Sequence, residues 1–338
     1  MSRSGSDIGL SEASDRVVGD DTGAGLSADA VPEQVGASRV TASPPTTTGP
    51  VRMLVGLARA VRPRQWVKNV LVLAAPFAAA QMNNPEVLRD SLIAFVAFSV
   101  AASGIYLVND SKDVEADRAH PVKRHRPIAA GIVPVPVAWT AAGVLLVGAL
   151  GLSFLARLDL VAVILVYEVV QLGYCFGLKH QPVVDLCIVA SGFLMRAVAG
   201  GAAAGIHLSQ WFLLVTAFGS LFMVAGKRYA EIRLAEKTGA KIRRSLEGYT
   251  ASYLRFVWAL SAAVVIMTYG LWAFEINARS GSVWSVISMV PFVVAVLRYA
   301  VDVDQARAGE PEEIVLRDRV LQILGLFWAV SLVLAFYL

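Results

Sequence analysis

Residues 87–117 read VLRDSLIAFVAFSVAASGIYLVNDSKDVEAD, an apolar run that leads directly into a group of acidic residues. The run over 87–108 is long enough to cross a bilayer, which takes about 20 mostly apolar residues. It also lacks the polar stripe that a soluble helix carries. Because hydrocarbon offers the backbone no hydrogen-bond partner, such a run must form a helix. The stretch therefore predicts a transmembrane α-helix that ends in carboxylates.

The rest of the chain has the same apolar character. Of its 338 residues 56% are hydrophobic and 17% are charged, whereas soluble domains are about a quarter charged. No run of short alternating strands, as in a barrel, is visible. Apolar segments are expected at roughly 67–82, 87–108, 134–156, 159–178, 183–204, 209–226, 252–274, 282–299 and 318–338. We predict an all-α polytopic membrane protein with nine transmembrane helices.

The first 50 residues differ in composition from the rest of the chain. They are rich in Ser, Thr, Gly, Ala, Asp and Pro, and the first aromatic residue is Trp66. Such a stretch cannot bury enough apolar surface to fold, and it lacks the apolar centre of a secretory signal. We expect residues 1–50 to be a disordered cytoplasmic tail and residues 51–338 to form the nine-helix catalytic domain in the membrane.

The basic residues set the orientation. With the N-terminus placed in the cytoplasm, 26 of the 30 Lys and Arg residues fall on the cytoplasmic side. Cytoplasmic loops of membrane proteins carry such an excess of Lys and Arg. This predicts a multi-pass protein of the cell membrane with its active site facing the cytoplasm. Because topology accounts for the basic charge, nucleic acid is not expected as a partner.

The acidic residues after the second segment have helical spacing. If the helix continues past residue 108, Asn109, Asp113 and Asp117 stand at i, i+4 and i+8, and Asp110 joins the same face. Carboxylates stacked at a helix C-terminus repel one another and the helix dipole, so a cation should compensate them. Mg²⁺ prefers carboxylate and amide oxygens and often bridges to phosphates. We predict Mg²⁺ as a cofactor held by Asn109, Asp113 and Asp117; the alternative is a solvated acidic loop.

A basic stretch at 118–131 comes directly after the acidic group and includes Lys123 and Arg126. Cations beside metal-binding carboxylates indicate a polyanion that both contact, such as a diphosphate. Topology alone would explain some Lys and Arg here, but it does not explain the acidic spacing.

Together these patterns resemble a known family. The pattern N-D-x-x-D-x-x-x-D at 109–117, followed by R-P-x-x-x-G at 126–131, resembles the first aspartate-rich motif of the UbiA prenyltransferase superfamily. The pattern R-P-x-x-W-x-K-N at 62–69 is similar to the start of that family, and the resemblance extends over about residues 60–338. It implies a UbiA-like bundle in which aspartate-held Mg²⁺ binds a prenyl diphosphate whose diphosphate leaves.

The chain departs from the common pattern of that family at the connection between the sixth and seventh segments. Residues 226–231 read GKRYAE, with one acid and two cations where most members have a second acidic motif. The turn at 174–185 adds further polar and charged residues. These features resemble one branch, the decaprenyl-phosphate phosphoribosyltransferases. The resemblance implies 5-phosphoribosyl 1-diphosphate (PRPP) as donor, decaprenyl phosphate as acceptor, and a product for arabinan synthesis in the cell envelope.

The chemistry of such a transfer fits these residues. The attacking phosphate is already ionised at neutral pH, so no strong base is needed, and ribose C1 passes through an oxocarbenium-like state that a carboxylate can stabilise. The expected catalytic residues are Asp110, Asp113, Asp117 and Asp185. The expected substrate-binding residues are Lys68, Lys123, Arg126, Tyr174, Lys179, Arg196, Lys227, Arg228 and Glu231.

Two charged residues, Glu168 and Arg196, fall within apolar segments. Such residues face protein or a water-filled cavity, and these two could form either a functional or a structural pair. Two other functions stay open: an ordinary prenyltransferase that moves a prenyl group to an aromatic acceptor, and a transporter. The transporter is less favoured because most ionisable groups cluster at one membrane face rather than at the midplane. The polyprenyl length and the oligomeric state, including a homo-oligomer, stay open.

Overall fold

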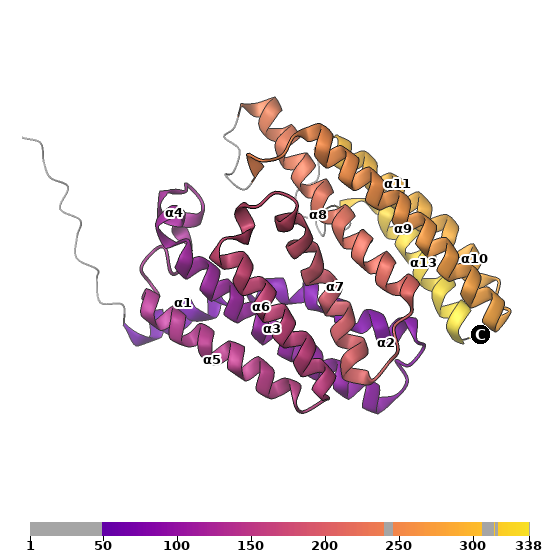
Figure 1. Cartoon of the computed structure of the whole chain (residues 1–338), viewed down its shortest axis with the longest axis horizontal. Coiled ribbons are helices and arrows are strands. Elements are labelled where there is room, and N and C mark those ends of the chain that lie inside the picture. The colour runs from indigo at the N-terminus through magenta and orange to yellow at the C-terminus, as the bar shows by residue number, and fades with distance from the viewer. Residues whose placement is uncertain (1–48, 240–245, 306–313, 315–316, 338) are drawn as a thin grey trace, which may run out of the picture. The chain divides into compact units, whose positions relative to one another are not determined.

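The computed structural model describes residues 49–239, 246–305, 314 and 317–337. Every regular element in this part of the chain is helical (Figure 1). The elements are α1 (Pro50–Ala60), η1 (Pro63–Leu73), α2 (Ala74–Ala78), α3 (Pro85–Lys112), α4 (Val114–Ala119), η2 (Lys123–His125), α5 (Val135–Ser153), α6 (Leu158–Phe176), η3 (Leu178–His180), α7 (Val184–Ala204), α8 (Gln210–Thr238), α9 (Ala251–Ser280), α10 (Trp284–Ile287), α11 (Met289–Asp304) and α13 (Arg319–Tyr337). The predicted all-α fold is confirmed. The prediction of a disordered tail at residues 1–50 concerns residues that the structure does not describe, apart from Gly49 and Pro50.

Eight helical stretches in the described residues are long and apolar enough to cross a membrane, with α10 and α11 forming one of them. They coincide with the second to ninth predicted apolar segments. The chain is therefore a multi-pass membrane protein. Helix α8 extends well past the predicted end of its segment at residue 226 and runs to Thr238.

The first predicted segment, 67–82, is built differently. It consists of the 3₁₀ helix η1 and the short helix α2. At about 2.0 Å per residue for η1 and 1.5 Å for α2, the two together rise roughly 30 Å, which is about the thickness of the hydrocarbon core. Just before η1, Arg62 contacts Asp110 near the end of α3. At the other end, the ring of Phe77 lies 6.0 Å from that of Phe336 near the end of α13. This segment lies where the first of the nine transmembrane helices was predicted, but it is not among the eight stretches of the described residues that are long and apolar enough to cross a membrane.

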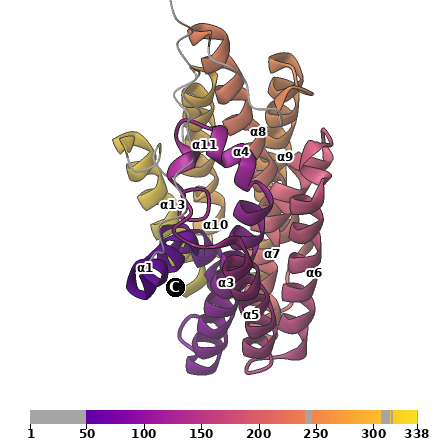
Figure 2. The same cartoon turned by 90° about the vertical axis from the view of Figure 1, so that its left-hand side faces the viewer.

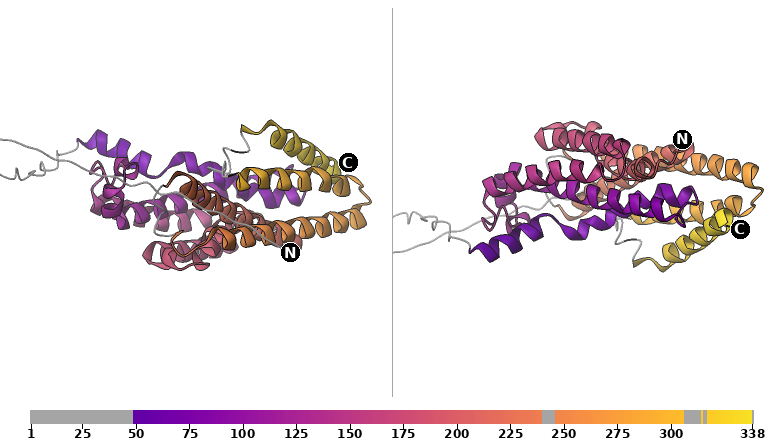
Figure 3. Two further views of the ribbon diagram at one scale, coloured as in Figure 1. Left: turned by 90° about the horizontal axis from the view of Figure 1, so that it is seen from above. Right: turned by 90° about the horizontal axis from the view of Figure 1, so that it is seen from below.

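The long helices pack around two groups of buried apolar side chains. The first group joins α3, α5 and α6, and includes Phe98, Leu107 and Ile164. The second joins α8, α9 and α11, and includes Tyr229 and Leu254. Helix α7 contributes to both groups. Figure 2 shows α3, α5, α6 and α7 running alongside one another. In both views of Figure 3, η1–α2 and α13 come together near the C-terminal end.

Helix α7 and the η1–α2 segment approach each other closely at Gly200. A Cβ atom at this position would lie 1.8 Å from the carbonyl oxygen of Val72, which is a backbone atom and cannot rotate away. Any side chain here would push η1 off α7. The glycine is therefore required for the position of η1, and η1 in turn carries residues of the candidate site.

Substituting this glycine should destabilise the protein. We expect Gly200→Ala to lower the free energy of unfolding by about 1–3 kcal/mol or more, the usual cost of overpacking a close contact. Gly143→Ala is the matched control, because a Cβ there meets nothing within 4 Å. Thermal unfolding of both variants in detergent measures the difference. A Gly200→Ala protein as stable as Gly143→Ala would contradict this account.

Candidate active site

The acidic motif lies where α3 ends and α4 begins. Asp113 comes after the last residue of α3 with φ −94° and ψ 11°, which bends the chain slightly. The helical hydrogen bonds nevertheless continue across it: the Asp113 amide bonds to the Asn109 carbonyl (2.9 Å) and the Asp117 amide to the Asp113 carbonyl (2.8 Å). The predicted helical spacing of Asn109, Asp113 and Asp117 is therefore present, with one bend.

Asp110 and Asp117 are both 2% exposed, and they share one arginine. Nη1 of Arg126 donates to Oδ2 of Asp117 (2.7 Å) and to Oδ1 of Asp110 (3.1 Å). Nζ of Lys123 lies 3.9 Å from the other oxygen of Asp117. Arg62 was not predicted as a site residue, yet its Nη2 contacts both oxygens of Asp110 at 2.6 and 2.8 Å. Its only signal in the sequence was the R-P-x-x-W-x-K-N pattern.

Asp113 has a different partner. Helix α6 ends at Phe176, and Gly177 adopts φ +150°, which favours glycine and turns the chain into η3. Lys179 on η3 then reaches back to Asp113 and bonds both carboxylate oxygens, at 2.5 and 2.7 Å. The connection between α6 and α7 thus joins the acidic motif. Together, Asn109, Asp110, Asp113, Asp117, Lys123, Arg126, Lys179 and Arg62 form what we call the acidic cluster.

A second ion pair lies at the start of α7. Asp185 is 1% exposed and Arg228, from the extended part of α8, is 7% exposed. Nη2 of Arg228 donates to Oδ1 of Asp185 (2.9 Å), and Nη1 donates to Oδ2. The hydroxyl of Tyr174 interacts with both residues. The hydroxyl of Tyr249 accepts a hydrogen bond from the backbone amide of Val183 (2.7 Å), which fixes the beginning of α7. Burial raises the pKa of Tyr249, so it stays a neutral phenol.

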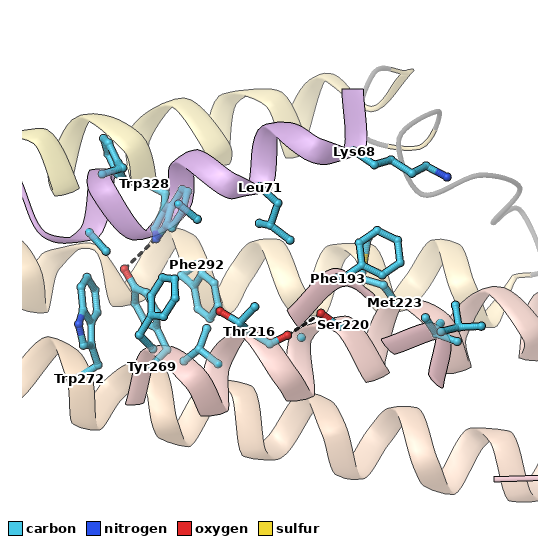
Figure 4. Close-up of a pocket in the computed structure, with 18 of the residues that line it drawn as sticks. Lys68, Leu71, Phe193, Thr216, Ser220, Met223, Tyr269, Trp272, Phe292 and Trp328 are labelled. Carbon is cyan, nitrogen blue, oxygen red and sulfur yellow. Dashed lines mark hydrogen bonds between the residues drawn. The ribbon is translucent and has the colours of Figure 1, made fainter. Parts of the chain in front are cut away.

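A cavity of about 940 Å³ begins beside this pair (Figure 4). Its basic end is lined by Lys68, Tyr174, Lys227 and Arg228. Most of the remaining wall is apolar and includes Leu71, Phe193, Phe212, Met223, Trp272 and Trp328. At the far end, Trp328 donates to the Tyr269 hydroxyl (2.7 Å), which also bonds Ser288 (2.6 Å). These bonds satisfy the polar atoms there. The cavity therefore suits a molecule with an anionic head and a long apolar tail.

The remaining predicted site residues are Glu231 and Arg196. Glu231 lies one helical turn beyond Lys227 on α8. Arg196 is not brought to the acidic cluster or to the Asp185–Arg228 pair: its Nε donates to Asn69 on η1 (2.7 Å) and its Nη1 to the Gly192 carbonyl (2.6 Å). Arg196 also does not bond Glu168, whose buried Oε1 has no hydrogen-bond partner among the described residues.

The oxygen donors of the acidic cluster are of the type that Mg²⁺ prefers. In this structure, however, Lys179 bonds Asp113, and Arg126 bonds Asp117. The described residues contain no group of three or more His, Cys, Asp and Glu side chains arranged around one point. The donor set therefore fits Mg²⁺ in chemistry, and binding requires the cations to exchange partners. Phosphate groups that arrive with the metal can take over those cations.

The Asp185–Arg228 pair should contribute strongly to stability, because removing one member of a buried ion pair leaves the other charge unpaired. We expect Asp185→Asn or Arg228→Gln to cost about 3–5 kcal/mol of unfolding free energy, and the double variant to cost less than the sum of the two. Glu275→Gln is the control, since it breaks the more exposed pair with Arg279 on α9 and should cost about 1 kcal/mol or less. Thermal unfolding tests this, and strictly additive losses would contradict it.

Comparisons with known proteins identify the family of the chain. The model of the UbiA prenyltransferase family matches residues 69–336. The decaprenyl-phosphate phosphoribosyltransferase of Mycolicibacterium smegmatis is 58% identical over 306 residues, covering 87% of this chain and 96% of that protein. The protein of the same name from Mycobacterium tuberculosis H37Rv is 60% identical over 286 residues, covering 83% and 94%.

A solved structure supports the fold. The structure of a UbiA homolog from Archaeoglobus fulgidus bound to GPP and Mg²⁺ matches with a TM-score of 0.62 and 16% identity, covering 83% of this chain and 98% of that one. At this identity the likeness shows the fold alone. With the family match and the high identity to the mycobacterial proteins, the chain belongs to the UbiA prenyltransferase family, and within it to the branch of these relatives.

Proposed function

We propose that this chain transfers the 5-phosphoribosyl group of PRPP to decaprenyl phosphate and releases diphosphate. The observation that carries the proposal is the apolar cavity with a basic end, which lies beside a separate cluster of cations and carboxylates. These features offer one place for a hydrocarbon chain and two places for phosphate groups. The names of relatives that are 58–60% identical over most of the chain support the same reaction.

The acceptor binds in the cavity on this proposal. Its hydrocarbon chain lies along the apolar wall, and its phosphate meets Lys68, Lys227 and Arg228 at the basic end. Arg228 is already held by Asp185, so its guanidinium is oriented before the lipid arrives. Charge-assisted hydrogen bonds from lysine and arginine are the strong contacts for phosphate.

The donor binds at the acidic cluster. Asn109, Asp113 and Asp117 would hold Mg²⁺ there, and the metal would supply positive charge to the leaving diphosphate. Lys123, Arg126 and Lys179 bond these carboxylates in the structure and turn to phosphate oxygens when the donor is bound. The turn at Lys179 and the last turn of α6 at Tyr174 connect the two sites.

The reaction itself needs little acid–base chemistry. An oxygen of the lipid phosphate attacks ribose C1, the bond from C1 to the diphosphate oxygen breaks, and the diphosphate leaves with the electron pair. A phosphate monoester has its second pKa near 6, so the attacking oxygen is already ionised at neutral pH. Asp185, which bonds the cavity-lining Arg228, is the carboxylate that we propose stabilises positive charge on the ribose.

The orientation and cellular role belong to the same proposal. The excess of Lys and Arg in these connections favours an orientation with the N-terminus and the site in the cytoplasm, where a water-soluble donor is available. The product would be a lipid-linked pentose phosphate that serves as a precursor for arabinan of the cell envelope.

A transfer assay tests the reaction. Purified protein with Mg²⁺, decaprenyl phosphate and PRPP labelled in the ribose should move the label into the organic phase. Ribose 5-phosphate should compete weakly, since it has one phosphate and lacks the diphosphate. If the protein ignores PRPP and instead moves a prenyl group from a prenyl diphosphate to an aromatic acid, the ordinary prenyltransferase function replaces this one.

Removing the metal or its ligands should stop the transfer. We expect EDTA to abolish turnover and added Mg²⁺ to restore it, and Asp113→Asn and Asp117→Asn to lower kcat/KM by at least about a hundredfold, since each lost charged contact costs roughly 1.5–3 kcal/mol and the metal is lost as well. Glu115→Gln is the control, because the Glu115 side chain is 79% exposed and pairs with Arg118. Full activity in EDTA would rule out the metal's role.

A further inference from the structure

The R-P-x-x-W-x-K-N pattern at 62–69 forms a seam between η1 and α3. Ser99, Ser103 and Asp110 lie on one face of α3, since they are spaced by four and seven residues. Nδ2 of Asn69 donates to Ser99 Oγ at 2.9 Å, and Nε1 of Trp66 donates to Ser103 Oγ at 3.1 Å. Both contacts hold η1 against α3 along its length.

Arg62 forms the last link of this seam. It stands between α1 and η1 with φ 55° and ψ 60°, a left-handed conformation that is costly for a residue with a side chain. A glycine would adopt it more easily, so the contacts of the side chain must offset this cost. Those contacts are the two short bonds to Asp110 and a guanidinium placed 4.7 Å from the ring centre of Tyr106.

Asp110 connects this link to the donor site. Its carboxylate is buried and lies between Arg62 and Arg126, and the same Nη1 of Arg126 that bonds Asp110 also bonds Asp117. The orientation of Arg126 therefore depends on where Asp110 is held. Asp110 bonds two guanidinium groups, so it acts on the reaction through these arginines.

Lys68 connects the seam to the acceptor site. It lies between Trp66 and Asn69 in the chain, and it lines the basic end of the cavity. Figure 4 shows it on the η1 ribbon near that end. Because Trp66 and Asn69 are both bonded to α3, the position of Lys68 between them depends on the seam.

We propose that Arg62 is a positioning residue that holds both substrate sites in register: through η1 it places Lys68 for the lipid phosphate, and through Asp110 it orients Arg126 for the donor diphosphate. This proposal rests on the function proposed above. Arg62 thus links the groove that holds the acceptor to the cluster that binds the donor.

Steady-state kinetics of the full-length protein test the proposal. Arg62→Gln should raise KM for PRPP and KM for decaprenyl phosphate, each by about tenfold or more, the effect of losing one charge-assisted hydrogen bond. Arg62→Lys should recover part of the loss because it keeps the charge. The double variant Arg62→Gln/Asp110→Asn should raise each KM by less than the product of the single effects, as for residues that act through one contact.

Arg64→Gln is the matched control, since Arg64 is an exposed arginine two residues away, and it should behave as wild type. Normal KM values for both substrates in Arg62→Gln would overturn the proposal, and so would an effect on one substrate only. If Arg62→Gln does not fold, the Arg62→Lys variant carries the same comparison.

Hydrogen exchange without substrate separates this proposal from the proposed function. The amides of residues 64–73 should exchange faster in Arg62→Gln than in wild type or Arg64→Gln. If the wild type transfers nothing from PRPP, the proposed function fails, and the exchange data still test the seam. Unchanged exchange over η1 would show that Arg62 does not hold it.

Discussion

The structure depends on one electrostatic constraint: carboxylates at the end of a membrane helix cannot be buried alone. Asp110 and Asp117 are almost fully buried, and burying an unpaired charge is far costlier than pairing it. Their partners, and that of Asp113, come from segments far apart in sequence: Arg62 before η1, Arg126 after η2, and Lys179 on η3. Neutralising the acidic motif therefore draws three separate connections to the end of α3 and assembles the site.

The same constraint prepares the site for a polyanion. In the acidic cluster, Arg62, Lys123, Arg126 and Lys179 face three carboxylates, so the cluster is cationic before any metal binds. On the proposed function, a metal bound by Asp113 and Asp117 would leave Lys123, Arg126 and Lys179 for phosphate oxygens, while Arg62 would keep its bonds to Asp110. One set of side chains thus serves the empty and the occupied site, which avoids leaving buried charges unpaired in either state.

Sequence patterns predicted those parts that depend on local spacing. Length and hydropathy predicted the spans, and helical spacing predicted the acidic motif together with nearby cations such as Lys123. Contacts between distant segments could not be predicted this way. Arg62 bonds an aspartate 48 residues away, and Arg196 bonds Asn69 on η1 rather than the suspected Glu168 on α6. Such partners depend on how helices pack, and spacing along one helix carries no information about that.

The sequence also did not predict the 3₁₀ form of η1. This form explains how one short segment can present side chains to three different surroundings. With three residues per turn, side chains repeat in straight rows. Val67 and Val70 form an exposed row, at 62% and 50% exposure, and Val67 also borders the cavity. Lys68 and Leu71 form a row along the cavity, and Trp66, Asn69 and Val72 form a row against α3 and α7. In an α-helix, which has 3.6 residues per turn, these rows would drift around the helix axis instead of running straight. The seam with α3 and the close contact at Gly200 supply the packing that keeps η1 in this less favourable helix.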